Sequence, residues 1–292
     1  MKIGVIGLGN MGEPMARNLV LAGYEVRGFD ILTPCPKDIK AVKSAIELAT
    51  LSDIVITMLP NGSIVKEVAK EILPNMARGS ILLDCSTIDV ESARLVAETA
   101  TDHGVFMADA PVSGGVSGAV AGTLTFMVGG STETFSTLKP LFDIMGQKAV
   151  HCGDSGNGQA AKICNNMILG ATMIVTCEAF SLADKLGLDR EKMFDVVSTS
   201  SGYSWSMNAY CPAPKVGPMS PADNDYKPGF SADLMLKDLR LSQQAAKAVD
   251  ADTPLGMHAT SLYQTFVEIE DGQGKDFSAM LPRFSKKNRT DT

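Results

Sequence analysis

A glycine-rich segment near the N-terminus has the residue types and spacing that bind anionic cofactors. Gly7, Gly9 and Gly12 form the pattern G-x-G-x-x-G, after a short apolar run and before residues typical of a helix. In such a unit the first glycine permits a tight turn, the second lets the backbone approach a pyrophosphate, and the third allows close helix packing. N–H groups at the helix start then face the anion. An ordinary glycine loop is the alternative. The pattern predicts a dinucleotide site with contacts at Gly7, Leu8, Gly9, Asn10, Met11 and Gly12.

Asp30 ends the second apolar segment, 25–29, at the distance expected for an acidic partner of this turn. A carboxylate in that place accepts hydrogen bonds from the ribose hydroxyls and repels a 2′-phosphate. The residues that follow, 31–35, include no Arg or Lys to bind such a phosphate. The sequence therefore favours NAD over NADP, with a merely solvated aspartate as the alternative.

Lys162 and Asn166 are spaced to act together in proton transfer. Residues four apart lie on one face of a helix, and the segment from Gln159 to about Leu186 is composed of helix-forming types. A lysine could act as general base for alcohol oxidation if its pKa fell from about 10.4 toward neutrality. Two solvated side chains are the alternative that spacing alone leaves open.

Two further segments offer polar groups for a substrate or cofactor. Ser113-Gly114-Gly115 follows a predicted strand and combines a hydroxyl with exposed backbone N–H groups, which suit a carboxylate. A plain turn is the alternative. Lys237 lies within an apolar helical stretch, where a lysine can also extend its amine to solvent without any function.

The elements that position these residues alternate in the first half of the chain. Predicted strands alternate with helical stretches, which indicates a parallel sheet wrapped by helices. Ligands of such sheets bind at the carboxyl ends of the strands, so Leu59-Pro60-Asn61, Ser86-Thr87 and 111–115 are candidate site loops, with Leu59 and Pro60 as cofactor contacts. The predicted strands are 2–6, 25–29, 54–58, 80–83, 105–108 and 124–128.

The strand pattern stops at the turn-rich segment 153–158, after which helical types dominate. Further helices are predicted at 189–199, 231–250 and 254–270. We therefore predict an α/β fold: a Rossmann-type dinucleotide-binding domain over 1–157 and an all-α substrate and oligomerisation domain over 158–292.

Composition excludes several classes of partner. The 292 residues carry a net charge of -7 and no basic run apart from Lys286-Lys287, which argues against nucleic acid or an anionic membrane as main partner. The apolar stretch 167–177 is too short to span a bilayer. The six cysteines form no C-x-x-C pair, so free thiols and no metal site are expected, with Cys164 a buried structural thiol. The first strand begins so near Met1 that we expect no leader peptide and a cytoplasmic location.

Four ordered motifs together resemble the β-hydroxyacid dehydrogenase family. Val5–Leu19 resembles the family's N-terminal signature, and Asp109–Gly115 its substrate loop. Gly158–Asn166 is similar to the segment that bears the catalytic lysine, and Leu236–Leu239 to a later lysine region. Within the family, Ser200-Ser201-Gly202, Trp205, Pro212 and Phe230 resemble the enzymes that act on hydroxyisobutyrate.

The resemblance implies a reversible, NAD-linked oxidation of 3-hydroxyisobutyrate to methylmalonate semialdehyde, as in valine breakdown. It implies that Lys162 is the general acid/base, that Asn166 orients the substrate, and that Ser113–Gly115 bind its carboxylate. Thr87 and Lys237 would contact the cofactor. A pocket for the 2-methyl group would be walled by Trp205 or Phe230, for which a place in the helical core is the alternative.

Members of the family are usually dimers or tetramers, so the resemblance also implies a homo-oligomer. The segment between Asp30 and the strand at Ile54, and the loop after Pro60, are shorter than in typical relatives. Another enzyme of the family, acting on tartronate semialdehyde, 4-hydroxybutyrate or a serine-like substrate, stays open. A non-catalytic dinucleotide-binding module and an imine reductase are disfavoured because Lys162 is present.

Overall fold

The computed structural model describes residues 1–285, so Lys286-Lys287 lie outside the described residues. The chain divides into two compact units, which we call the sheet unit, Met1–Lys162, and the helical unit, from Ile163 onward. The contacts thus place the division a few residues beyond 157. The first turn of the long helix α7 (Asn157–Leu186) belongs to the sheet unit.

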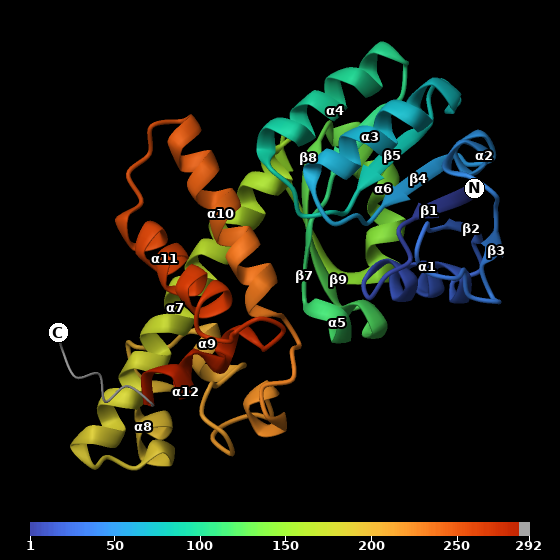
Figure 1. Ribbon diagram of the computed structural model, residues 1–292. Coiled ribbons are helices and arrows are strands. Elements are labelled where there is room, and N and C mark those ends of the chain that lie inside the picture. Colours follow the sequence, from blue (N-terminus) through green and yellow to red (C-terminus); the bar gives the residue numbers. More distant parts are fainter. Residues whose placement is uncertain (286–292) are drawn as a thin grey trace. The chain divides into compact units, whose positions relative to one another are not determined.

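Every strand of residues 1–285 lies in the sheet unit, and together they form one nine-stranded sheet (Figure 1). The strand order is β3-β2-β1-β4-β5-β6-β8-β7, with β9 paired to β8. β-Branched and other apolar residues dominate the central strands, which are buried on both faces. The strands are β1 (Lys2–Ile6), β2 (Glu25–Phe29), β3 (Lys40–Ala41), β4 (Ile54–Thr57), β5 (Ile81–Asp84), β6 (Phe106–Asp109), β7 (Val112–Ser113), β8 (Leu124–Gly130) and β9 (Gly146–Gly153).

The sheet is mixed, so the prediction of a purely parallel sheet is wrong for its last part. β1 to β6 are parallel, but β8 runs antiparallel to both β6 and β7. Between β7 and β8 the only helix is the seven-residue α5 (Gly115–Ala121), whereas a parallel crossover usually needs about a dozen residues or more. β3, β7 and β9 were also not predicted, because two are very short and β9 is largely polar or half-buried.

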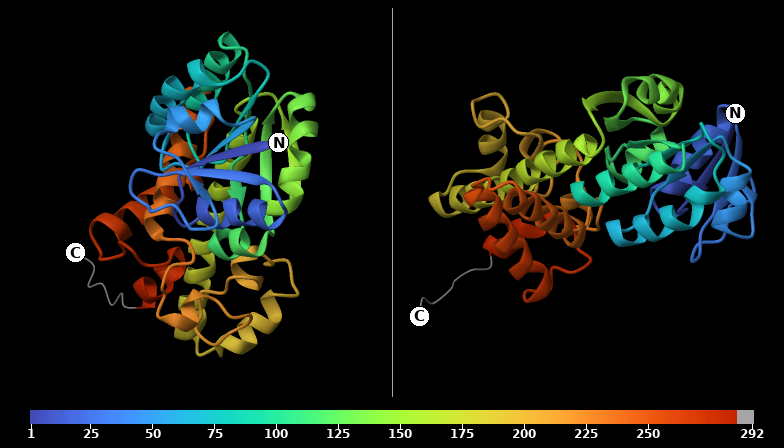
Figure 2. Two further views of the ribbon diagram at one scale, coloured as in Figure 1. Left: turned by 90° about the vertical axis from the view of Figure 1, so that its right-hand side faces the viewer. Right: turned by 90° about the horizontal axis from the view of Figure 1, so that it is seen from above.

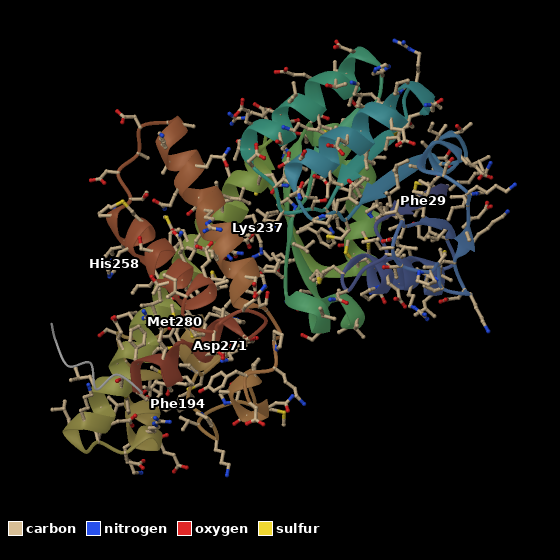
Figure 3. All side chains as sticks on the ribbon, in the orientation of Figure 1. Phe29, Phe194, Lys237, His258, Asp271 and Met280 are labelled. Atoms are coloured by element: carbon tan, nitrogen blue, oxygen red, sulfur yellow. The ribbon has the colours of Figure 1, made fainter. Side chains whose placement is uncertain are left out.

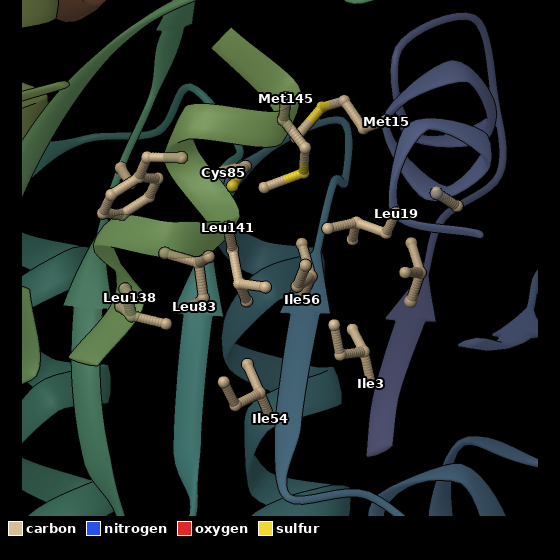
Figure 4. Close-up of a cluster of buried hydrophobic side chains, with 14 of the residues drawn as sticks. Ile3, Met15, Leu19, Ile54, Ile56, Leu83, Cys85, Leu138, Leu141 and Met145 are labelled. Carbon is tan, nitrogen blue, oxygen red and sulfur yellow. The ribbon is translucent and has the colours of Figure 1, made fainter. Parts of the chain in front are cut away.

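Helices cover both faces of the sheet and bury two apolar clusters. On one face, α1 and α6 pack against the strands through Met15, Leu19, Leu138 and Leu141 (Figure 4). On the other face, α2, α3 and α4 pack through a second set of buried side chains that includes Val65. These helices are α1 (Gly12–Leu21), α2 (Ala45–Thr50), α3 (Gly62–Ile72), α4 (Val90–Asp102) and α6 (Thr132–Met145), with a 3-10 turn η1 (Leu73–Asn75).

The helical unit confirms the prediction of a second, helical domain. α7 and α10 lie side by side in the helical unit (Figure 2). Gly170 of α7 allows this close approach, since a Cβ there would lie 3.0 Å from Leu239 and 3.1 Å from Met235. Ser231 caps the start of α10 by accepting from the Leu234 N–H. The other elements are α8 (Arg190–Val197), α9 (Trp205–Asn208), η2 (Pro221–Asn224), α10 (Ala232–Ala248), α11 (Pro254–Glu268), η3 (Phe277–Ala279) and α12 (Met280–Ser285).

Among residues 1–285, α7 is the one helix long and apolar enough to cross a membrane. Half of its most apolar window is buried inside the structure. The central helix of a soluble domain has the same length and composition, so this feature is weak evidence for a membrane.

Candidate active site

The glycine-rich turn between β1 and α1 has the close backbone approaches that its spacing predicts. Gly7 has a φ of +94°, and a Cβ there would lie 2.2 Å from the Met58 carbonyl oxygen. A Cβ on Gly12 would lie 1.9 Å from the Gly7 carbonyl oxygen. Gly9 differs, because a Cβ there would meet nothing within 4 Å. The turn is therefore tightly packed at its two ends and open at Gly9, where a phosphate could approach the backbone.

The start of α1 suits an anion. The residue before the helix is Met11, and its side chain makes no capping hydrogen bond. In contrast, Asn61, Asp89 and Ser131 cap α3, α4 and α6 with side-chain oxygens. Within the first turn of α1, the Glu13 N–H donates to the Gly9 carbonyl oxygen at 3.1 Å and Pro14 has no N–H. The side that a phosphate could approach is therefore the open glycine turn at the uncapped helix start.

Asp30 lies directly beside this turn. Its Oδ2 accepts from the Leu8 N–H at 2.7 Å, and its Oδ1 accepts from the N–H groups of Leu32 and Thr33 at 2.7 and 2.8 Å. Partial burial acts to raise the pKa of Asp30, but these three backbone N–H groups outweigh it and the pKa is lowered. An ionised carboxylate with remaining acceptor capacity can bind ribose hydroxyls and repels a 2′-phosphate.

A buried carboxylate that the sequence analysis did not single out organises the neighbouring strand ends. Asp84, at the end of β5, accepts on Oδ1 from the hydroxyls of Thr57 at 2.8 Å and Ser86 at 2.6 Å. The Ser86 hydroxyl oxygen accepts in turn from the Leu59 N–H at 2.8 Å. This network joins the loop of Leu59 and Pro60 to the loop of Thr87. Its signal in the sequence was an aspartate at the end of an otherwise apolar strand.

Lys162 lies just after the point where α7 joins these loops. The Gln159 side chain donates to the Ser86 carbonyl oxygen at 2.8 Å and accepts from the Ile88 N–H at 3.1 Å. The first turn of α7 is thereby attached to the loop that carries Thr87. Lys162 follows three residues later and is only 7% exposed. The buried Lys162 therefore lies next to a helix turn that is attached to the strand-end loops.

The Ser113–Gly115 segment ends β7 and begins α5. Gly114 and Gly115 have φ values of +133° and +62°, which residues with a side chain rarely adopt. Ser113 and Gly115 are half-buried and Gly114 is exposed, so hydroxyl and backbone groups there reach solvent. Whether the segment binds a carboxylate stays a prediction.

In the helical unit, Asn166 and Lys237 share one carboxylate, Asp238. Asn166 Nδ2 donates to Asp238 Oδ2 at 2.5 Å, and Lys237 Nζ lies 3.4 Å from Asp238 Oδ1. Figure 3 labels Lys237 on α10. Asp238 and Asn166 are buried, whereas the Lys237 side chain is 32% exposed. Asp238 belongs to the same four-residue motif as Lys237, but the sequence analysis gave it no role.

Trp205 and Phe230 belong to one aromatic cluster. Trp205 is half exposed and stacks on Tyr210 at 4.9 Å, while Phe230 contacts Phe277 edge-on at 5.7 Å. Asp276 joins the two halves, because its Oδ2 accepts from the Tyr210 hydroxyl and from the Phe230 N–H. Both residues are therefore partly accessible, and Phe230 also packs against the buried cluster of the helical unit, so the pocket role stays a prediction.

The sheet unit brings most of the predicted cofactor residues to the carboxyl edge of its strands. It also holds Lys162, while Asn166 follows one turn later on α7. Trp205, Phe230 and Lys237 lie in the helical unit.

Cys164 is exposed, so its prediction as a buried thiol is wrong. It faces outward from α7, between the buried Lys162 and Asn166. All six cysteines are free, as predicted.

Comparisons with known proteins give the family. Residues 2–153 match the family described as the NAD binding domain of 6-phosphogluconate dehydrogenase, and residues 156–284 match that described as the NAD-binding of NADP-dependent 3-hydroxyisobutyrate dehydrogenase. A probable 3-hydroxyisobutyrate dehydrogenase of Mycobacterium bovis is 46% identical over 287 residues, with 96% of both chains covered. The chain belongs to the 3-hydroxyisobutyrate dehydrogenase family.

Two further matches refine this assignment. The structure of Mycobacterium tuberculosis 3-hydroxyisobutyrate dehydrogenase with L-serine is 45% identical and superposes with a TM-score of 0.91, covering 97% of this chain and 98% of that chain. An NAD-dependent L-serine dehydrogenase of Pseudomonas aeruginosa is 42% identical, with 97% of both chains covered. This member of the family is an NAD-dependent 3-hydroxyacid dehydrogenase. The predicted family, α/β fold class and NAD cofactor are confirmed.

Proposed function

We propose that this protein oxidises 3-hydroxyisobutyrate to methylmalonate semialdehyde, a step of valine breakdown. The observation that carries the proposal is the buried Lys162, which follows directly on a helix turn attached to the strand-end loops of an NAD-binding domain. Relatives named for this reaction cover almost the whole chain, which supports the choice of substrate.

The buried lysine would move the proton of the reaction. Neutral Lys162 would accept the hydroxyl proton of the substrate at Nζ, and in the reverse direction it would return that proton to the carbonyl oxygen. NAD, when bound, accepts the hydride from the carbinol carbon. Ser113–Gly115 would hold the substrate carboxylate.

Asn166 would orient the substrate. An ionised carboxylate accepts hydrogen bonds but cannot donate one. The contact with Asp238 therefore comes from the amide nitrogen of Asn166. The Asn166 oxygen accepts from Asn165 Nδ2 at 2.9 Å. These two contacts fix the amide in one orientation, which suits a group that positions a reacting hydroxyl.

The aromatic cluster would select the 2-methyl group. Trp205 and Phe230 offer apolar surface, and one methyl in an apolar pocket is worth about 1–3 kcal/mol. L-Serine carries an ammonium where 3-hydroxyisobutyrate carries this methyl. The L-serine dehydrogenase of Pseudomonas aeruginosa makes serine the second candidate substrate.

A substrate panel tests the assignment. We expect kcat/KM for 3-hydroxyisobutyrate to exceed that for 3-hydroxypropionate about ten-fold or more, as one methyl group allows. Lactate should be unreactive because its carboxylate and hydroxyl lie too close together to reach both sites. The rates are read from NADH absorbance. A higher kcat/KM for L-serine would overturn the substrate while leaving the dehydrogenase class intact.

The role of Lys162 is tested by substitution. Lys162→Ala should lower kcat by about two to four orders of magnitude while NAD still binds, and Lys162→Arg should not restore turnover, because arginine stays protonated. Lys185→Ala, an exposed lysine in the last turn of the same helix, is the matched control and should be unaffected. Normal turnover of Lys162→Ala would refute the assignment.

We further propose that the protein is a homo-oligomer, a dimer or a tetramer. Ile168, Val175 and Leu182 recur every seven residues on α7 and are each more than half exposed. Such spacing places them along one face of the helix, and a contiguous apolar face is typical of protein contacts. Sedimentation of the protein and of Val175→Glu tests this, since the variant should dissociate and a monomeric parent protein would contradict the proposal.

A further inference from the structure

Asp109, at the end of β6, holds the start of α7 by direct hydrogen bonds, although the two are far apart in the sequence. Its Oδ1 accepts from the Gly156 N–H at 2.6 Å and its Oδ2 from the Gln159 N–H at 2.9 Å. The carboxylate is 1% exposed. It therefore takes the place of a capping side chain, although it is separated from the helix by about fifty residues of sequence.

Two glycines make room for this carboxylate. A Cβ on Gly129 would lie 2.6 Å from Asp109 Oδ1, and a Cβ on Gly158 would lie 2.8 Å from its Oδ2 and 2.3 Å from the Met127 carbonyl oxygen. Real Cβ atoms do not approach this closely. A side chain at either position would displace the helix start or the carboxylate, so the packing fits Asp109 and the first turn of α7 tightly together.

The charge of Asp109 also favours this position. Burial raises the pKa of Asp109, while the backbone N–H groups of Gly156, Gln159 and Gly158 oppose that rise. Negative charge is stabilised at the N-terminus of a helix, where the partial positive charge of the macrodipole lies. Asp109 and the Gln159 side chain therefore hold one helical turn by four hydrogen bonds at two neighbouring strand ends.

We infer that Asp109 is a positioning residue for Lys162. Together with Gln159 it fixes the first turn of α7. Lys162 lies three residues after Gln159, slightly less than one turn further along the same helix. An error of about 1 Å in the placement of a reacting group can lower the rate about 10²-fold. The hydrogen bonds that hold the first turn of α7 therefore determine how well Lys162 Nζ is placed to accept the hydroxyl proton of the substrate. The inference rests on the proposed function of Lys162 as general base.

A double-mutant cycle tests it, with the better of 3-hydroxyisobutyrate and L-serine as substrate. Asp109→Asn retains size but loses one acceptor, and should lower kcat about 10- to 100-fold while KM for NAD is unchanged. In the Lys162→Ala background the same substitution should not lower the residual kcat further, because the group it positions is absent. Gln159→Met, which removes only the side-chain bonds, should show the same pattern.

Asp189→Ala is the matched control, because Asp189 caps α8 by accepting from the N–H groups of Glu191 and Lys192. It should lower the melting temperature and leave kcat unchanged. Equal losses of kcat from Asp109→Asn in both backgrounds, or unchanged kcat in Asp109→Asn and Gln159→Met, would overturn the inference. Failure of the proposed function is separate: a wrong substrate appears as a preference for L-serine in the unmodified protein, and a wrong role for Lys162 appears as normal turnover of Lys162→Ala.

Discussion

Replacing Asp84 by asparagine should change how the stability of the protein depends on pH. Asp84 is fully buried between the hydroxyls of Thr57 and Ser86, and its Oδ2 has no hydrogen-bond partner among residues 1–285. Burial raises the pKa of this carboxyl from 3.8 to about 6, against the hydrogen bonds from Ser86 and Thr57, which lower it. Asparagine has nearly the same shape and no charge to bury.

The direction and the size of this pH dependence follow from the pKa shift of Asp84. A carboxyl whose pKa is higher in the folded state contributes stability that is present below the unfolded pKa and lost as pH rises through the folded pKa. The shift of Asp84 corresponds to about 3 kcal/mol, lost between about pH 3 and pH 7. Asparagine escapes this loss, so its free energy of unfolding relative to that of the unmodified protein should rise by about 2 kcal/mol from pH 4.5 to pH 8.

Urea unfolding at several pH values measures this difference. Far-UV circular dichroism follows the whole chain, whereas fluorescence of Trp205, the only tryptophan, follows the helical unit. Asp102→Asn, which removes an exposed carboxylate of the same sheet unit, is the control and should show little pH-dependent difference. A constant difference between Asp84→Asn and the unmodified protein at every pH would refute the reasoning.

Three other predictions concern cofactor choice, the glycine turn and the thiols. Replacing Asp30 by Ser together with Ile31 by Arg should move the ratio of kcat/KM toward NADP, because repulsion is removed and a phosphate partner is added; an unmodified protein that already prefers NADP would contradict this. Gly12→Ala should abolish NAD binding in calorimetry, since its Cβ would lie 1.9 Å from the Gly7 carbonyl oxygen. Cys164 is the one exposed cysteine, so a thiol reagent should label it first in the native protein; equally fast labelling of Cys164→Ser would show otherwise.

The cofactor half of the site could be predicted because its determinants are local. The turn at Gly7–Gly12 and the carboxylate of Asp30 lie within one strand–helix–strand segment. The turn requires close backbone approaches that only glycine permits, so the glycines in the sequence indicate it. The helical character of the second half was predictable for the same reason. Residue type and spacing also identified Lys162 and Asn166 as candidates. Their roles stay predictions for the experiments above.

The tertiary structure alone decided what holds these residues in place. That β8 runs antiparallel to β6, and that Asp109 reaches the N–H groups of Gly156 and Gln159, depends on which strand ends become neighbours. The exposure of Cys164 depends likewise on which face of α7 is covered. Sequence determines hydrogen bonds between residues close in the chain, because the local backbone sets them. Hydrogen bonds over about fifty residues exist only after the sheet has assembled, so their partners cannot be predicted from spacing.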